Sequence, residues 1–575
     1  MNLVFNMNEK NNTDNFSRID NFNDFLHQAD FSLIKTLHAD PQSTVDGNDH
    51  SPRQVYSGHY VPVTPIALTS PKYITHSREF FKELGLGDKL IEDENFTQFF
   101  SGNYKVKTKD LNNFGWATGY ALSIYGTEYN SQCPFRTGNG YGDGRAISIF
   151  EGVFKGQRWE MQLKGSGPTP YCRGGDGRAV LRSSIREFLA QELMHSLGVP
   201  TTRSLTLFVS EKDKVKRPWY QKDSESFDPE IMVDNYVAIA TRVAPSFLRI
   251  GQIELFARRV KNKSHDESFQ ELKMIVEHLI NRNYKDEIFN NKPFSEQVIE
   301  LAYLYRKRLT SLVANWIRVG YCQGNFNSDN CALGGYTLDY GPFGFCELFD
   351  PLFQPWTGGG EHFSFFNQPL AAELNFKMFC SSLKLLVEKD KSSSNKLVEI
   401  MHGFTKCMDE EIQIMWSKKL GIKIYDENLI KNLFNLMITT KVDYTKFFRN
   451  LSKIPNNVND LKDSFYKPPT NELESSWNIW IKSWKSCLDK SFELKDISNS
   501  MLQINPKYTW REWLVVSAYE KAEKGDYSEF NDLQNLFKDP YGNNSSELNK
   551  KYDRLRPNKY FNLGGISHYL SLIHI

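Results

Sequence analysis

The chain has 575 residues, and its 70 lysines and arginines nearly balance its 69 aspartates and glutamates. Hydrophobic residues make up 40% of the sequence and aromatic residues 14%, which is enough for real cores and excludes wholesale disorder. A near-neutral charge also argues against a protein that mainly coats nucleic acid or an anionic membrane. At about 150 residues per domain, this length predicts roughly three to four domain-sized units.

Cysteine usage and hydropathy restrict the class further. The 8 cysteines include no Cys-x-x-Cys pair, which excludes a disulfide scaffold and the usual zinc ribbons. Because no run of about 18 apolar residues occurs, we expect no membrane-spanning helix. We therefore expect a soluble chain of a reducing compartment, with neither nucleic acid nor a membrane as a partner.

Residues 1–30 are rich in asparagine and aspartate. A secretory signal would need a basic start followed by an apolar run, and a mitochondrial transit peptide would be rich in arginine and poor in acids. The segment has neither composition. We expect a flexible N-terminal extension over residues 1–45.

The body of the chain changes character along its length. Residues 73–207 alternate short strands, glycine-rich turns and helices. Between residues 266 and 314, apolar side chains recur at three- and four-residue spacing, which predicts helices. Residues 320–366 are rich in glycine and aromatic residues and predict loops and short strands, and helices dominate again after Gln368.

A glycine-rich turn containing Gly142, Gly144 and Arg145 precedes a predicted hairpin that turns at residues 155–156. Lys164 lies on the polar face of its second strand. Glycines let backbone N–H groups approach phosphate oxygens, and a lysine ammonium neutralises phosphate charge. The alternative is an ordinary tight turn with a solvated lysine, and the segment alone leaves both open.

A helix is predicted over residues 182–197, because one stripe of it is apolar and Gly198 follows. The stripe consists of Ile185, Phe188, Leu189, Leu193 and Leu197. Glu187 has two interpretations. It stands at capping-box spacing from Ser184, or it pairs with Lys164 as the helix glutamate of protein kinases pairs with the strand lysine. We favour the ion pair.

Two arginines, Arg242 and Arg249, follow in the stretch TRVAPSFLRIG. Their guanidinium groups could clamp a polyphosphate in a bidentate way. Isolated arginines are more often partners in surface salt bridges, and their spacing in the sequence does not decide between the two.

The stretch QGNFNSDN, residues 323–330, and the DYG that starts at Asp339 resemble the two catalytic loops of kinases. Asn330 and Asp339 fall on the magnesium-binding positions, and oxygen ligands of this kind suit Mg²⁺ bound together with phosphates. Gln323 and Asn325 stand where kinases carry the histidine and the catalytic aspartate. An amide cannot take a proton from a hydroxyl, so ordinary kinase chemistry is not supported. Asp329 is the nearby carboxylate.

Several long motifs in this order resemble the selenoprotein O family, which includes the bacterial YdiU proteins. The motifs are LKGSGPTPYCRGGDGRAVLRSSIREFLAQE, TRVAPSFLRIG, NSDN and TLDYGPFGF. The resemblance runs from about residue 73 to about residue 534. It implies an α+β, protein-kinase-like two-lobed fold with a helical C-terminal extension. The lobes would cover residues 46–240 and 241–450, and the helical region residues 451–575.

The resemblance also implies an activity. The family transfers AMP from ATP, bound in a flipped orientation, to Ser, Thr or Tyr hydroxyls of proteins and releases pyrophosphate. Mg²⁺ is the implied metal, with Mn²⁺ as the alternative. By resemblance, Asp329 accepts the proton, Asn330 and Asp339 hold the metal, and Glu187 supports Lys164. The residues implied to line ATP are Gly142, Gly144, Arg145, Lys164, Asp176, Gly177, Arg242, Arg249 and Asp339.

Two departures from the family concern cysteine. Family members commonly end in a cysteine-containing tail, whereas no cysteine follows Cys487 here, and the loop FQPWTGGGEHF also lacks one. We therefore do not expect the disulfide control of relatives. Cys172 and Cys331 flank the predicted site, where small buried fillers are the favoured interpretation.

Two alternative functions stay open. One is a protein or small-molecule kinase, and the other is a catalytically silent, ATP-binding pseudokinase scaffold. The intact set of Lys164, Asp329, Asn330 and Asp339 argues against the scaffold. Because eukaryotic relatives are typically mitochondrial, the resemblance implies a mitochondrial location for a eukaryotic protein and a cytoplasmic one otherwise.

Overall fold

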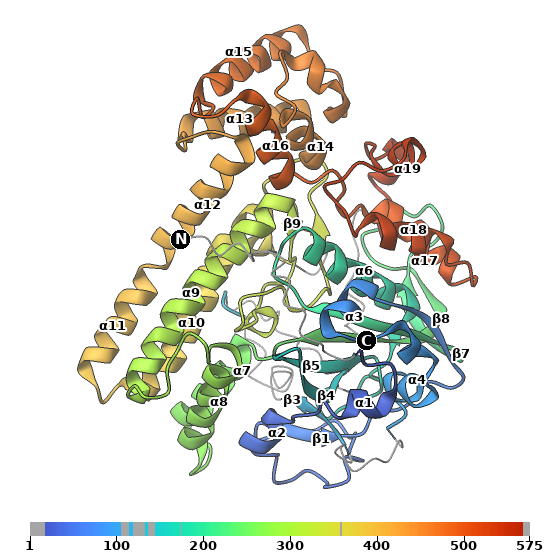
Figure 1. The fold of residues 1–575 in the computed structure, drawn as a ribbon, viewed down its shortest axis with the longest axis vertical. Coiled ribbons are helices and arrows are strands. Elements are labelled where there is room, and N and C mark those ends of the chain that lie inside the picture. The colour runs from blue at the N-terminus through green and yellow to red at the C-terminus, as the bar shows by residue number, and fades with distance from the viewer. Residues whose placement is uncertain are drawn as a thin grey trace.

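The computed structural model describes residues 18–104, 114–118, 133–135, 144–172, 174–356 and 359–566. In these residues an antiparallel sheet with short helices around it is joined to a large set of helices (Figure 1). The α+β fold class expected from the sequence is confirmed. The structure adds the order of the strands, which fixes the surroundings of Lys164.

The main sheet has eight strands within the described residues, in the order β1-β3-β4-β5-β8-β7-β2, with β6 paired to β8. The strands are β1 (Tyr60–Val63), β2 (Pro71–His76), β3 (Gly115–Thr118), β4 (Ala146–Phe154), β5 (Gln157–Lys164), β6 (Ala179–Val180), β7 (Arg203–Trp219) and β8 (Ile231–Ala244). All of these pairs are antiparallel. β5 therefore lies between β4 and β8, and its register sets Gln162 opposite Arg242.

The predicted hairpin is confirmed as β4 and β5. Lys155 (φ 47°) and Gly156 (φ 79°) both have left-handed backbone, as two-residue hairpin turns require. The prediction of a half-polar β5 was incomplete, because Glu160, Gln162 and Lys164 are all buried. Lys164 is only 3% exposed, so the alternative of a solvated lysine is wrong.

The helix predicted over residues 182–197 is α6 (Leu181–Ser196), which ends before Gly198 with φ 71°. Its N-cap residue is Val180, so Ser184 lies inside the helix and the capping-box interpretation of Glu187 is wrong. The apolar stripe of α6 faces a large hydrophobic cluster that also contains α9, α10 and α17. The position of the helix that carries Glu187 is thus fixed by hydrophobic packing against these other helices.

The helices that follow the sheet run along one side of the molecule to its far end and then return to α6 (Figure 1). They are α7 (Ile250–Asn262), α8 (Ser268–Asn283), α9 (Phe294–Val319), α10 (Gln368–Val387), α11 (Lys391–His402), α12 (Phe404–Leu420), α13 (Glu427–Thr440), α14 (Tyr444–Leu451), α15 (Asn471–Cys487), α16 (Leu494–Ile504), α17 (Glu512–Ala522), α18 (Ser528–Leu536) and α19 (Ser546–Tyr552). α8 and α9 confirm the helices predicted between residues 266 and 314. None of the helices described here is long and apolar enough to cross a membrane.

The expectation of a flexible extension over residues 1–45 is wrong for its described part, which begins at residue 18. This part forms α1 (Phe22–Leu26) and α2 (Ser32–Thr36), next to α3 (Arg78–Leu84) and α4 (Glu94–Phe100). Phe25 is fully buried, with its ring 4.6 Å from that of Phe150 on β4. Composition pointed to disorder, whereas the apolar spacing of Phe22, Phe25 and Leu26 fits one buried helical face.

The two faces of the sheet belong to different hydrophobic clusters. Leu205, Phe208 and Ile239 pack into a cluster with α1, α3 and α4, whereas Leu207 and Ala240 pack into the larger cluster with α6. Both faces are therefore covered, as in a sheet that forms the middle layer of a domain. The domain limits expected at residues 240 and 450 stay predictions.

We predict that His278 on α8 makes stability depend on pH. Burial lowers the pKa of the His278 imidazole to about 4, and its Nδ1 lies 2.7 Å from Thr36 Oγ1. The unfolded chain, with a histidine pKa of 6.5, binds this proton more readily, so stability is full above pH 6.5 and falls as pH approaches 4. The full effect is about 3 kcal/mol.

Thermal unfolding followed from pH 7.5 to pH 4 checks this prediction. The His278→Gln variant should lose part of the pH dependence, whereas a His402→Gln variant, altered at an exposed position of α11, should keep it. Parallel pH profiles for wild type and His278→Gln would contradict it.

Candidate active site

Three side chains from three separate elements meet at the end of β5. The ammonium Nζ of Lys164 lies 2.8 Å from Glu187 Oε2 of α6 and 2.5 Å from Asp339 Oδ1. All three side chains are at least 95% buried. The predicted Lys164–Glu187 ion pair is confirmed, and it includes the aspartate of the DYG motif.

Arg242 of β8 completes this charged cluster. Its Nη1 lies 2.6 Å from Asp339 Oδ1 and 3.6 Å from Glu187 Oε1, while its Nε donates to Gln162 Oε1 at 2.8 Å. Arg242 and Arg249 are both fully buried, so the surface salt-bridge alternative is wrong for both. Their action as a clamp on polyphosphate stays a prediction.

The pKa values of the two carboxyl groups shift in opposite directions, although burial raises and the nearby cations lower both. Burial alone would raise the pKa of the Asp339 carboxyl, but Lys164 and Arg242 hold this pKa well below its ordinary value of 3.8. Burial raises the pKa of the Glu187 carboxyl above 4.5, because the nearby Lys164 offsets this effect only in part and Asp339 adds to it. Asp339 therefore stays ionised at physiological pH.

Arg249 lies at the start of α7 and holds the loop that carries Asp329. Its Nη1 donates to the Asp329 carbonyl at 2.9 Å and its Nε to the Phe247 carbonyl at 3.2 Å. A Cβ on Gly251 would lie only 3.2 Å from the Asp329 backbone nitrogen, so glycine permits this close approach. Asp329 belongs to a short 3₁₀ helix, Ser328–Asn330, and is 1% exposed.

The predicted metal ligands, Asn330 and Asp339, both lie in the chain segment that connects the two strands of a small sheet, β9 (Tyr321–Cys322) and β10 (Gly344–Phe345). Asn330 Nδ2 donates to the Asn325 carbonyl at 3.1 Å, which leaves the amide oxygen of Asn330 for a ligand. Lys164 and Arg242 both contact the same oxygen of Asp339, Oδ1. An amide oxygen and an ionised carboxylate are suitable donors for Mg²⁺ together with phosphate oxygens. The described residues contain no cluster of three or more histidine, cysteine or acidic side chains arranged for a metal.

The glycine-rich residues form a second group beside the charged cluster. Gly144 is packed so closely that a Cβ would lie 2.3 Å from the Tyr171 carbonyl oxygen, and a Cβ on Gly177 would lie 2.1 Å from the Gly167 carbonyl carbon. The Arg145 carbonyl accepts from the Gly165 N–H at 3.1 Å, next to Lys164. Gly142 lies outside the described residues.

Asp176, by contrast, points to a structural partner. Its carboxylate oxygens accept from Arg217 Nη2 of β7 at 2.6 and 2.9 Å, and its side chain is 44% exposed. Arg217 also donates to the Arg178 carbonyl at 3.1 Å, so the pair fixes the loop at residues 175–178. The structure does not bring Asp176 into contact with the Lys164 cluster.

Two glutamines of the site were not predicted to act in it. Gln162 holds Arg242, and its position on the polar face of β5, beside Lys164, was the available signal. Gln323 donates from Nε2 to the Asp339 carbonyl at 3.1 Å and accepts from the Tyr321 hydroxyl at 2.5 Å. The amide that replaces the kinase histidine thus orients the backbone of the DYG motif.

The strand lysine, the helix glutamate and the DYG aspartate together define a kinase-like, nucleotide-binding class of fold. Within this class, the profile of the family described as "Protein adenylyltransferase SelO" matches residues 48–538. The chain belongs to the SelO family, a family of nucleotidyltransferases.

Similar proteins in bacteria are named "Protein nucleotidyltransferase YdiU". The one from Aromatoleum aromaticum is 32% identical over 527 residues, which cover 89% of this chain and 93% of the relative. That of Methylobacillus flagellatus is 31% identical over 92% of this chain and 96% of the relative. That of Flavobacterium johnsoniae is 32% identical over 88% of this chain and 92% of the relative. These bacterial relatives give no support to the mitochondrial location.

We predict that Gln162 sets the orientation of Arg242. In a Gln162→Ala variant the buried Arg242 Nε loses its acceptor, which costs about 1–2 kcal/mol and should weaken binding of a fluorescent ATP analogue by roughly 5- to 30-fold. Gln534→Ala, which removes a hydrogen bond from α18 to His76, is the control. Equal affinity in the wild type and the Gln162→Ala variant would show that Arg242 keeps its orientation without Gln162.

Proposed function

We propose that this protein transfers AMP from ATP to hydroxyl side chains of other proteins and releases pyrophosphate. The observation that carries the proposal is the buried cluster of Lys164, Glu187, Arg242 and Asp339, combined with amides at the positions of the kinase base. Membership of the SelO family supports it. ATP and hydroxyl-bearing proteins are the proposed substrates.

The amides argue against phosphoryl transfer. Gln323 uses its side chain to hold the Asp339 backbone, and the Asn325 carbonyl holds Asn330. Neither side chain can take the proton of an attacking hydroxyl. Asp329 is the carboxylate next to Asn330, and we assign the role of proton acceptor to it.

We infer the following step. A hydroxyl oxygen of the acceptor protein attacks the α-phosphorus of ATP, and the bond from this phosphorus to the bridging oxygen of the β-phosphate breaks. Pyrophosphate leaves, and the hydroxyl proton passes to Asp329. Lys164, Arg242 and Arg249 bind the phosphates, and Glu187 orients Lys164.

Asn330 and Asp339 would hold the Mg²⁺, or Mn²⁺ in its place, because both offer oxygen donors and Asp339 remains ionised. Bound there, the metal would neutralise charge on the departing pyrophosphate. The residues that would line ATP include Gly142, Gly144, Arg145 and Gly177. Asp176 would contribute indirectly, by fixing the position of its loop through Arg217. We also propose that the two lobes cover residues 46–240 and 241–450 and that the helical region covers residues 451–575. The proposed location is cytoplasmic.

Mass spectrometry of acceptor proteins incubated with the enzyme, ATP and Mg²⁺ tests the reaction. We expect an adenylyl mass increment, and label from the α-phosphate but not the γ-phosphate of ATP on the protein. An Asp339→Ala variant should give none of this product. A phosphoryl increment would support the kinase alternative, and ATP binding without any product would support the scaffold.

Asp329→Asn separates the proton acceptor from the nucleotide site. General base catalysis contributes about 10²- to 10⁴-fold, so turnover should fall by at least about 100-fold. Binding of an ATP analogue should persist, because the backbone carbonyl of residue 329 still accepts from Arg249. Asp350→Asn, at an exposed loop position, is the matched control. Normal turnover in Asp329→Asn would exclude Asp329 as the base.

A further inference from the structure

Residues 510–513, which we call the clamp segment, connect the C-terminal helices to the active site. They join the chain that follows α16 to the first turn of α17. Trp510, Arg511 and Trp513 are each at least 96% buried, although the segment lies far along the chain from Lys164 and Asp339. Connecting segments usually lie on the surface, so the polar groups of a segment buried to this extent need specific partners within the protein.

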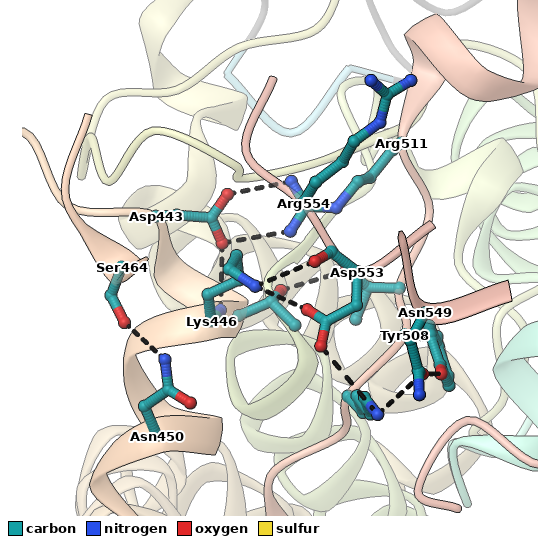
Figure 2. A network of polar contacts seen from close by, with 12 residues as sticks. Asp443, Lys446, Asn450, Ser464, Tyr508, Arg511, Asn549, Asp553 and Arg554 are labelled. Carbon is teal, nitrogen blue, oxygen red and sulfur yellow. Dashed lines mark hydrogen bonds and ion pairs between the residues drawn. The ribbon is translucent and has the colours of Figure 1, made fainter. Parts of the chain in front are cut away.

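One side of the clamp segment is anchored to the loop that follows β10 and to the start of α14. Arg511 Nη1 lies 2.7 Å from Glu347 Oε2 and 2.8 Å from Asp443 Oδ2, and Trp513 Nε1 donates to the same Glu347 oxygen at 2.9 Å. Asp443 also caps α14 by accepting from the Lys446 N–H at 2.9 Å. Figure 2 shows Arg511 against Asp443, with Lys446 and Asp553 beside them.

The other side of the clamp segment reaches α6. Arg186 donates from Nε and Nη2 to the two carboxylate oxygens of Glu512 at 2.9 and 3.1 Å. Trp510 Nε1 donates to Glu512 Oε2 at 2.8 Å. The Arg186 guanidinium also lies 4.6 Å from the centre of the Phe343 ring, and that ring is 5.1 Å from the Trp510 ring. A bidentate pair of this kind is directional as well as strong.

The positions of these contacts link the clamp segment to the chemistry. Arg186 is the neighbour of Glu187 on α6, and successive helix residues point in different directions, so one faces the site while the other faces the clamp segment. Phe343 belongs to the loop that begins with Asp339. The clamp segment therefore contacts both of the elements that supply carboxylates to Lys164.

We propose that the clamp segment sets the distance between Glu187 and Asp339, and that Arg186 and Glu512 are positioning residues for AMP transfer. The inference rests on the proposed function for its readout of activity. A shift of α6 away from the DYG loop breaks the Arg186–Glu512 pair and its contacts with Phe343 and Trp510. The C-terminal helices thus hold α6 and the DYG loop together around Lys164.

Charge reversal in the full-length protein tests the proposal. Arg186→Glu and Glu512→Arg should each lower kcat for adenylyl transfer at least tenfold, with less than a threefold change in KM for ATP. The double variant should recover at least tenfold over either single variant, because the pair forms again with exchanged signs. Lys521→Gln, which breaks a pair between α17 and α18 only, and Leu433→Ala, which opens a cavity in α13, are the controls.

Amide hydrogen exchange gives a readout that does not need activity. Peptides from α6 should exchange at least tenfold faster in each single variant and return towards wild type in the double variant. Unchanged exchange in α6, wild-type kcat in the single variants, or an equal loss of kcat in Leu433→Ala would overturn the proposal. If the wild type transfers no AMP but α6 responds as expected, the proposed function fails and the clamp stands.

Discussion

The structure depends on keeping a lysine charged inside the protein. Removing an ammonium ion from water costs several kcal/mol, and only well-placed opposite charges offset that cost. Lys164 and Arg242 both lie within ion-pair distance of Glu187 and Asp339. Two cations and two carboxylates from four different elements therefore neutralise each other. A shift in any of these elements would leave a buried charge without its partner, so the cluster specifies how they are arranged.

Each part of the fold has a place in that arrangement. The antiparallel register sets Gln162 opposite Arg242, so neighbouring strands supply the two cations and the glutamine that holds one of them. The position of α6 in the larger hydrophobic cluster ties Glu187 to the helices rather than to the sheet alone. Gln323, which follows β9, holds the backbone at Asp339 by donating to its carbonyl. The site is thus built from contacts between elements, and no single motif contains it.

This explains which features the sequence could predict. The turn at residues 155–156 and the end of α6 at Gly198 depend on local backbone preferences, so glycine and hydrophobic spacing predicted them. The Lys164–Glu187 pair required the kinase pattern, because spacing alone also allowed a capping box. The Asp176–Arg217 pair, the burial of Phe25 and the role of Gln162 depend on which strands and helices become neighbours. Those contacts join residues far apart in the sequence. The flexible extension was predicted wrongly for the same reason, because the composition of residues 1–45 does not show that Phe25 packs against β4.

A neutral cluster also constrains how a nucleotide can bind. Lys164 and Arg242 already share Asp339 Oδ1, so phosphates that attract these cations draw them away from a carboxylate that remains ionised. Under the proposed function, that carboxylate would then need another positive partner, and an oxygen-seeking divalent cation beside Asn330 would supply it. On this proposal, phosphate and metal binding would be coupled through Asp339, since either alone would leave unbalanced charge in a buried site. Such coupling would require a firmly held backbone at Asp339 while its side chain changes partners, and the hydrogen bond from Gln323 to the Asp339 carbonyl would serve that purpose.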